Sequence, residues 1–169
     1  MFFETKDLYT KKLTIEDAKR FHQVCTQPYI LKWMDDWDMD YEHVEKLVTH
    51  FANGYEVNDP EKHPYIMGIW HKADQQFIGI CGFGPKYELG EKTEIAYFID
   101  EQYANRGYMT QIVSKAIPFF FAQFDKPYLS ALVHQDNFIS RRIVLKHQFS
   151  LYPENISEGF LEPHYRLYR

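Results

Sequence analysis

The sequence lacks several features that would place it in particular classes of protein. Its two cysteines, Cys25 and Cys81, are too few and too far apart for a disulfide scaffold or a cysteine-based zinc site. No apolar run approaches the roughly 20 residues that cross a membrane, and the N-terminus has no secretory-signal pattern. The eight histidines show neither HxxxH nor HExxH spacing. We therefore expect a cytoplasmic protein with reduced thiols, no metal and no membrane partner.

Positive charge is also scarce. The chain has 19 Lys and Arg against 24 Asp and Glu, a formal net charge of -5. Such a chain has no basic footprint for a nucleic-acid backbone and favours cationic partners, so we expect no nucleic-acid partner. Hydrophobic residues make up 45% of the chain and aromatic residues 18%, which is typical of a folded globule. The length and the absence of repeats or linkers predict one domain over residues 1–169.

Hydrophobic periodicity predicts a mixed α/β fold. Strands are expected over residues 8–13, 65–70, 77–83, 93–100 and 128–134, with a closing pair over 149–152 and 165–168. Helices are expected over residues 15–25, 41–51, 108–124 and 140–146, with a further short helical turn after Pro28. The Asn53-Gly54 pair marks a loop after the second helix. The three strands between residues 65 and 100 are close in sequence, so they predict an antiparallel meander.

The turn Asn105-Arg106-Gly107 joins a predicted strand to a predicted helix. A helix start leaves backbone N–H groups unpaired at the positive end of the helix dipole, which makes it a cradle for anions. Gly107 lets the backbone approach a phosphate, Asn105 tolerates left-handed backbone angles, and Arg106 adds a permanently charged donor. A pyrophosphate would suit this turn, although an ordinary helix start has the same pattern.

A second motif lies downstream of this turn. Residues 103–111 read YANRGYMTQ, and residues 137–149 read NFISRRIVLKHQF. Together they resemble the acyl-CoA core of the GNAT N-acetyltransferases, especially the subgroup that modifies ribosomal-protein N-termini and related amines. That subgroup commonly reads Y-R-G-K-G-Y-A-T-E and then N-x-x-S-x-R-V-L-E-K-x-G-F. Residues 13–34 and 77–85 resemble its first helix pair and its third strand, so the resemblance covers nearly the whole chain.

The resemblance implies an α/β (α+β) fold, the GNAT acyl-CoA N-acyltransferase fold, with a mixed central sheet of about seven strands and about four helices. It implies acetyl-CoA as cofactor and direct acetyl transfer to a primary amine, either a protein N-terminus or a small polyamine- or aminoglycoside-like amine. The cofactor-binding residues that it implies are Tyr97, Ile99, Asn105, Arg106, Gly107, Tyr108, Met109, Thr110, Asn137 and Ser140.

Two other functions stay open at this point. A non-catalytic acyl-CoA-binding relative is one, because Ala104, Met109 and Val144 depart from the family pattern. An unrelated α/β interaction module with an aromatic partner surface is the other. The oligomeric state is open too, with a homodimer as one option.

Two residues are candidates for the chemistry. Glu94 begins a largely apolar strand and is the expected base, acting through water. The alternative is a purely structural role, which we call the structural interpretation: an ion pair with Lys92 or a solvated position at the strand end. Ser140 matches the serine of the subgroup and is the expected donor to the departing sulfur; a first-turn helix serine is its structural interpretation. Val144 occupies the position where many family members have a tyrosine, and Tyr152 and His134 are secondary candidates.

The acidic segment from Asp35 to Asp40 gives the clue to the acceptor. Its carboxylates alternate with aromatic residues and predict a cation-attracting patch, with Trp33, Asp35, Asp36 and Trp37 as substrate-binding residues. A solvated loop with one core tryptophan is the structural interpretation.

Overall fold

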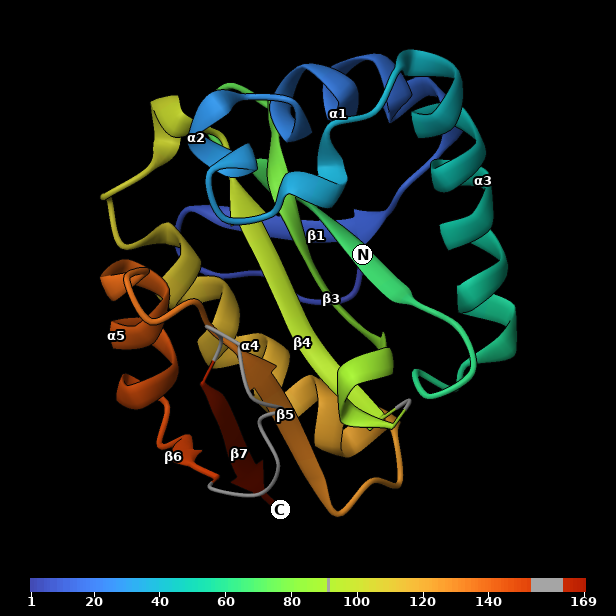
Figure 1. Ribbon diagram of the computed structural model, residues 1–169. Coiled ribbons are helices and arrows are strands. Elements are labelled where there is room, and N and C mark those ends of the chain that lie inside the picture. The colour runs from blue at the N-terminus through green and yellow to red at the C-terminus, as the bar shows by residue number, and fades with distance from the viewer. Residues whose placement is uncertain (91, 153–162) are drawn as a thin grey trace.

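A computed structural model describes residues 1–90, 92–152 and 163–169. In this part of the chain, seven strands form one mixed sheet in the order β1-β2-β3-β4-β5-β7-β6 (Figure 1). The strands are β1 (Leu8–Lys12), β2 (Tyr65–His71), β3 (Phe77–Lys86), β4 (Lys92–Ile99), β5 (Tyr128–Leu132), β6 (Ser150–Leu151) and β7 (His164–Tyr168). The helices are α1 (Ala18–Cys25), α2 (Pro28–Leu31), α3 (Tyr41–Val57), α4 (Tyr108–Gln123) and α5 (Phe138–Lys146). Short 3₁₀ turns are η1 (Ile15–Asp17), η2 (Asp35–Trp37), η3 (Tyr87–Leu89) and η4 (Glu101–Tyr103).

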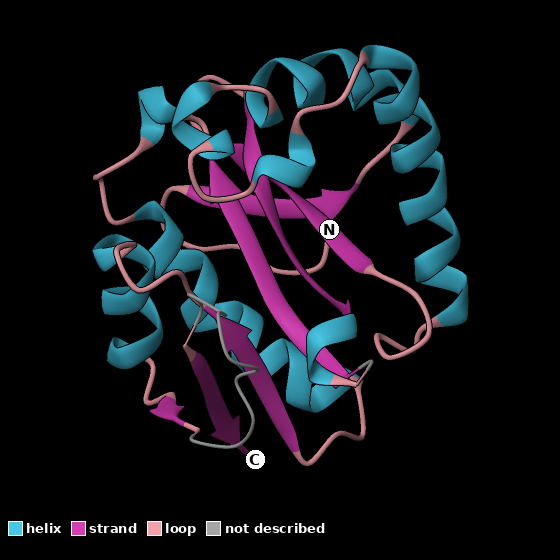
Figure 2. Ribbon diagram, in the orientation of Figure 1, coloured by secondary structure: helices cyan, strands magenta, loops and turns pink. Residues whose placement is uncertain are grey.

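Helices cover both faces of the sheet (Figure 2). On one face, Phe21 of α1 and Phe51 of α3 pack in a cluster with Phe98 of β4. On the other face, α4 and α5 pack in a second cluster, in which Phe120 contacts Phe83 of β3 with ring centroids 4.9 Å apart. The sheet is buried on both sides here because alternate strand residues supply apolar side chains to each helical layer.

The sheet opens between β4 and β5. Strands β2, β3 and β4 form the predicted antiparallel meander. Strand β5 lies parallel to β4, and within the described residues their register joins only Glu94 with Ser130. Because this pairing lies near the start of β4, the rest of β4 runs on without a β5 neighbour. The two strands therefore separate toward their carboxyl ends, the edge at which open α/β sheets bind ligands.

The predicted end of α3 is wrong. The helix does not stop near residue 51 but continues through Asn53 and Gly54 to Val57, and Asn58 ends it with a left-handed φ of 50°. Gly54 is needed inside the helix because a Cβ there would lie 2.0 Å from the carbonyl oxygen of Pro64. The buried Tyr55 then donates a hydrogen bond to the Ile66 carbonyl. These tertiary contacts override the local turn signal.

Other predicted boundaries need smaller corrections. Residues 15–25 divide into η1 and α1, and the strand expected over 128–134 ends at Leu132. Helix α5 begins at Phe138, before residue 140, because the Asn137 side chain caps it by accepting from the Ser140 N–H. Helix α4 buries the predicted packing face, Met109, Ile112, Ala116 and Phe120.

Candidate active site

A cavity of about 350 Å³ lies where β4 and β5 separate. Its walls come from β4, from the end of β5 and the start of α5, and from the segment between α2 and η2. Ten of the residues predicted from sequence line it: Trp33, Asp35, Asp36, Trp37, Glu94, Tyr97, Ile99, Met109, Asn137 and Ser140. The fold thus brings together predicted residues from four separate segments of the chain, 33–37, 94–99, 109 and 137–140.

The other five predicted residues, Asn105, Arg106, Gly107, Tyr108 and Thr110, are not among the described lining residues and lie in the turn and the first helical residues of α4. Asn105 and Gly107 have left-handed φ angles of 59° and 75°. The Gln111 N–H donates to the Gly107 carbonyl at 3.1 Å. The N–H groups of residues 108–110 lie before this bond, in the first turn of the helix, where no earlier helical carbonyl can accept from them. An ideal Cβ on Gly107 would meet no protein atom within 4 Å. The turn is therefore open toward an approaching anion.

Side chains around this turn contact the protein. Arg106 Nη2 donates to the Gln102 carbonyl at 2.9 Å, and the Tyr108 hydroxyl lies 3.1 Å from His71 Nε2. Met109, whose side chain was a departure from the family pattern, is 7% exposed and belongs to the core cluster around α4. Its bulk is therefore directed largely into the core rather than over the turn.

Glu94 is at the point where the strands begin to separate. Its carboxylate Oε1 accepts a hydrogen bond of 3.3 Å from the Leu132 N–H of β5, and the side chain is half-buried. Lys92, the ion-pair partner suggested by sequence, has its Nζ 3.5 Å from Glu61 Oε1. Glu94 thus bridges the two strands and faces the cavity.

Ser140 and Tyr97 meet at the wall of the cavity. The two hydroxyl oxygens are 2.8 Å apart and join α5 to β4. The Ser140 N–H donates to Asn137 Oδ1 at 3.1 Å, so Asn137 caps α5. Burial raises the pKa of the Tyr97 phenol above its ordinary value. The sequence predicts both residues but not their pairing, because no periodicity links positions on a strand and on a later helix.

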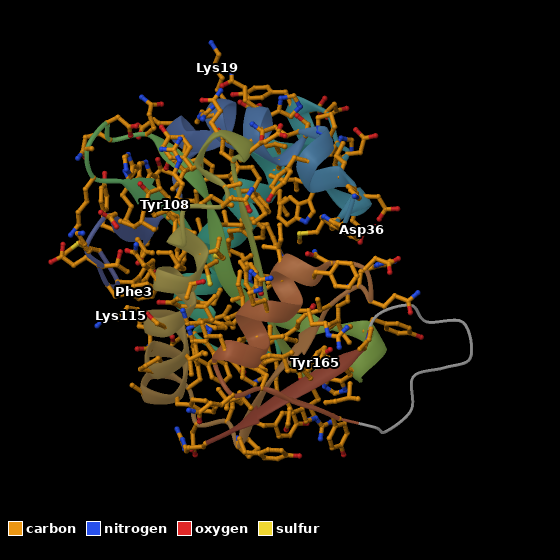
Figure 3. The ribbon with its side chains drawn as sticks, turned by 90° about the vertical axis from the view of Figure 1, so that its left-hand side faces the viewer. Phe3, Lys19, Asp36, Tyr108, Lys115 and Tyr165 are labelled. Atoms are coloured by element: carbon orange, nitrogen blue, oxygen red, sulfur yellow. The ribbon has the colours of Figure 1, made fainter. Side chains whose placement is uncertain are left out.

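The acidic segment is split by the structure. Asp35 and Asp36 are exposed and line the cavity, whereas Asp40 accepts from the His43 N–H at 2.9 Å, caps α3, and has its pKa lowered by that bond. Figure 3 shows Asp36 and Tyr108 on opposite sides of the molecule. The acidic segment and the turn before α4 therefore approach the separated strands from different directions.

The two tryptophans differ. The Trp33 ring lies 5.4 Å from the His134 ring, between two cavity-lining segments. The Trp37 ring centroid lies 5.1 Å from that of Phe98 and 5.6 Å from that of Phe21. Trp37 is therefore the core tryptophan that the solvated-loop alternative expected, and it also lines the cavity.

Sequence reasoning missed some lining residues, and one of its secondary candidates also lies elsewhere. Tyr29 and Lys86 line the cavity, and no motif marks either of them. Tyr152, considered as a substitute for the missing tyrosine, is not among the described lining residues; its ring lies 3.5 Å from the Arg166 guanidinium.

His164 of β7 supports β5 beside this site. Its Nε2 lies 3.0 Å from the buried Ser130 hydroxyl, and burial followed by the charge of Arg166 lowers the pKa of His164 to about 4.

Because the His164 side chain of the unfolded state takes up a proton near pH 6.5, the free energy of unfolding should fall as the pH falls below that value. Between pH 7 and pH 5 we expect the free energy of unfolding to fall by about 2 kcal/mol at this site. Urea titrations of the wild type and of His164→Asn check this, since the variant should lose that much less; equal losses would contradict it.

Among the described residues, no group of three or more His, Cys, Asp or Glu side chains is arranged to hold a metal ion. No described helix is both long and apolar enough to cross a membrane.

A sheet that opens between two parallel strands, beside a helix start suited to phosphate, is an arrangement for binding an extended phosphorylated ligand. Residues 7–150 match the family model described as "Acetyltransferase (GNAT) domain". The chain belongs to the GNAT acetyltransferase family and is an acetyltransferase.

Relatives agree with this assignment. The chain is 24% identical over 147 residues to the uncharacterized N-acetyltransferase YoaA of Bacillus subtilis (strain 168), covering 86% of this chain and 81% of that protein. Its fold is similar to that of an acetyltransferase from Agrobacterium tumefaciens, with a TM-score of 0.80, 17% identity, and 99% and 94% of the two chains covered. It is also similar to RimL, a ribosomal L7/L12 alpha-N-protein acetyltransferase solved with coenzyme A, with a TM-score of 0.79, 14% identity, and 97% and 95% covered.

Proposed function

We propose that this protein transfers an acetyl group from acetyl-CoA directly to a primary amine. The observation that supports this most strongly is the cavity between β4 and β5, which has the Glu94 carboxylate on one strand and the Ser140 hydroxyl across from it. Amine acylation by a thioester needs a route for the amine proton and a stabilised leaving sulfur, and these two groups supply them. The similar RimL structure contains coenzyme A, which favours the same donor here.

The residues present fit acetyl-CoA. The open, left-handed Gly107 and the N–H groups in the first turn of α4 suit a pyrophosphate. The cavity beyond them is lined by apolar residues of β4 and α5, such as Ile95 and Ile143, which suit the uncharged arm that carries the thioester. The proposed cofactor-binding residues are Tyr97, Ile99, Asn105, Arg106, Gly107, Tyr108, Met109, Thr110, Asn137 and Ser140. Two buried free thiols, Cys25 and Cys81, favour the cytoplasmic location expected from sequence.

The acceptor side favours a cationic substrate with an amine of low basicity. Asp35 and Asp36 place negative charge at the cavity, and Trp33 adds an aromatic wall. Deprotonation at pH 7 costs about 1 kcal/mol for an α-amine and about 4.6 kcal/mol for a lysine amine. A single carboxylate acting through water therefore suits an α-amine, as on a protein N-terminus, or a small polyamine- or aminoglycoside-like amine whose pKa is lowered.

Calorimetry with acetyl-CoA, followed by turnover with a panel of amines, tests the proposal. Binding together with CoA release on addition of an amine is the expected result. Binding without turnover on any amine would favour a non-catalytic acyl-CoA-binding role, and no binding at all would remove acetyl-CoA from the function.

Gly107→Val should weaken acetyl-CoA binding at least tenfold, about 1.4 kcal/mol. A Cβ at this position would meet no protein atom within 4 Å, so the new side chain would extend into the open space at the turn where a phosphate must approach. Gly90→Val is the matched control, because Gly90 has a φ of 63°, equally open surroundings and a position outside this turn. Both variants should lose similar stability, whereas calorimetry should show weaker binding for Gly107→Val alone. Equal affinities would exclude the turn from the binding site.

The double variant Asp35→Asn/Asp36→Asn should raise KM for a cationic amine severalfold and flatten its salt dependence, with Kd for acetyl-CoA unchanged. The reason is that lost carboxylates lower the local concentration of the cation, an effect that salt screens over about 8 Å. Asp38→Asn is the control, because Asp38 is exposed in the same segment but is not among the described lining residues. Steady-state kinetics at two salt concentrations measure the difference. The same response in the control would mean that the segment acts only through net charge.

A further inference from the structure

Three hydroxyl-bearing side chains are among the described residues that line the cavity: Tyr29, Tyr97 and Ser140. Two of them are paired, because the Tyr97 and Ser140 hydroxyl oxygens lie 2.8 Å apart. We infer that Tyr97 is a positioning residue that donates its hydrogen bond to Ser140 and so holds the Ser140 hydroxyl as a donor to the departing sulfur. This inference rests on the proposed function and adds to it a role for Tyr97 that goes beyond contact with the cofactor.

Either hydroxyl could donate in this pair, and the Tyr97 hydroxyl also lies 3.5 Å from the Ser140 carbonyl oxygen. The role inferred for Ser140 requires Tyr97 to be the donor. A serine hydroxyl has one hydrogen, so it can donate into the cavity only if it does not donate to Tyr97. A phenol has an ordinary pKa of about 10 and is protonated at neutral pH, so Tyr97 has a hydrogen to give; burial raises its pKa further. Helix α5 fixes the backbone of Ser140, whose N–H donates to Asn137 Oδ1 at 3.1 Å. Tyr97 is anchored separately, since its ring packs against the core cluster beneath β4.

The chemistry balances without a proton leaving either hydroxyl. The amine nitrogen bonds to the acyl carbon, the carbon–sulfur bond breaks with its electron pair remaining on sulfur, and the amine proton leaves toward Glu94 through water. The products are an amide, a thiolate and one proton. Since a thiol has a pKa of about 8.5, the thiolate needs a hydrogen bond rather than full protonation. A chain of two hydroxyls that polarise each other strengthens the final donor.

The titration of bound CoA tests this pairing without turnover. The thiolate absorbs in the ultraviolet, so a pH titration of the complex gives the pKa of the bound thiol. A donor held toward sulfur stabilises the thiolate and lowers that pKa. Tyr97→Phe and Ser140→Ala should each raise it by about one unit, and the double variant should raise it little further, because both remove the same donor. In turnover, each single variant should lower kcat about tenfold.

Tyr9→Phe is the matched control, because the Tyr9 hydroxyl bonds to Gln75 at 2.9 Å and Tyr9 is not among the described lining residues. It should leave the thiol pKa and kcat unchanged. Replacing Tyr97 by 3-fluorotyrosine keeps its shape and strengthens the donor, so the thiol pKa should fall; this replacement serves if Tyr97→Phe does not fold.

The outcomes separate the two proposals. A thiol pKa that is the same in wild type, Tyr97→Phe and Ser140→Ala would overturn the inference even if the enzyme is active. Shifts that simply add in the double variant would overturn the pairing. A wild type that binds CoA but acetylates no amine would end the proposed function, while the titration would still decide the hydrogen bond. No binding of CoA would overturn both.

Discussion

Glu94→Gln is expected to lower kcat on the order of 100-fold while changing KM for the acceptor little. A base acts in the transition state, and removal of a general base typically costs 10² or more in rate. Glutamine keeps the volume and keeps a carbonyl oxygen that can accept from the Leu132 N–H, a bond of 3.3 Å in the wild type. The substitution therefore removes the charge and leaves the bridge between β4 and β5 in place. Steady-state kinetics with the best amine of the panel measure the loss.

Glu94→Leu is the matched comparison, because leucine removes both the charge and the acceptor. If Glu94 is the base, both variants lose kcat and only Glu94→Leu also loses stability. The defect of Glu94→Gln should shrink as the pH rises, since free amine becomes abundant. Full activity of Glu94→Gln together with an unstable Glu94→Leu would assign Glu94 to strand bridging alone.

Much of this site follows from local patterns in the sequence. The meander from β2 to β4 and the buried face of α4 follow from periodicity, and the start of α4 follows from Gly107. Gly107 is informative because its left-handed φ is a property of the backbone that a side chain would disfavour. The family resemblance in residues 103–111 and 137–149 then identifies two segments of the site. Local sequence patterns do not predict how far apart these segments lie in space.

The remaining features depend on contacts between distant segments. The extension of α3 through Gly54 depends on Pro64, and the pairing of Tyr97 with Ser140 depends on how α5 is set against β4. The acidic segment shows the same limit in part. Asp40 directly precedes a predicted helix, so its role as a helix cap follows from the sequence and is confirmed. The place of Asp36 at the cavity does not follow from the sequence, because it depends on how the neighbouring elements are set against β4.

Another long-range contact connects α1 to the segment that leads into the turn at residues 105–107. Asp100 directly follows β4 and is completely buried. Its Oδ2 lies 2.5 Å from Arg20 Nη2 of α1, and its Oδ1 accepts from the Gln102 N–H at 2.9 Å, which caps η4. Arg20 Nε also donates to the Phe77 carbonyl at 3.2 Å. This carboxylate thus organises the segment that leads into residues 105–107, and its buried charge is balanced from another element.

Arg20→Met is therefore expected to lower the free energy of unfolding by about 3–5 kcal/mol, because it leaves a buried carboxylate without its counter-charge. The double variant Arg20→Met/Asp100→Asn should recover most of this loss, since a neutral amide can still accept from the Gln102 N–H. Lys46→Met is the control, because the Lys46–Glu42 pair has a comparable separation of 2.7 Å but both side chains are exposed, so its loss should change stability little. Urea unfolding of the three variants measures these differences. If the double variant is as unstable as Arg20→Met, the arginine stabilises α1 through packing and its bond to Phe77, and the buried charge of Asp100 is not what it balances.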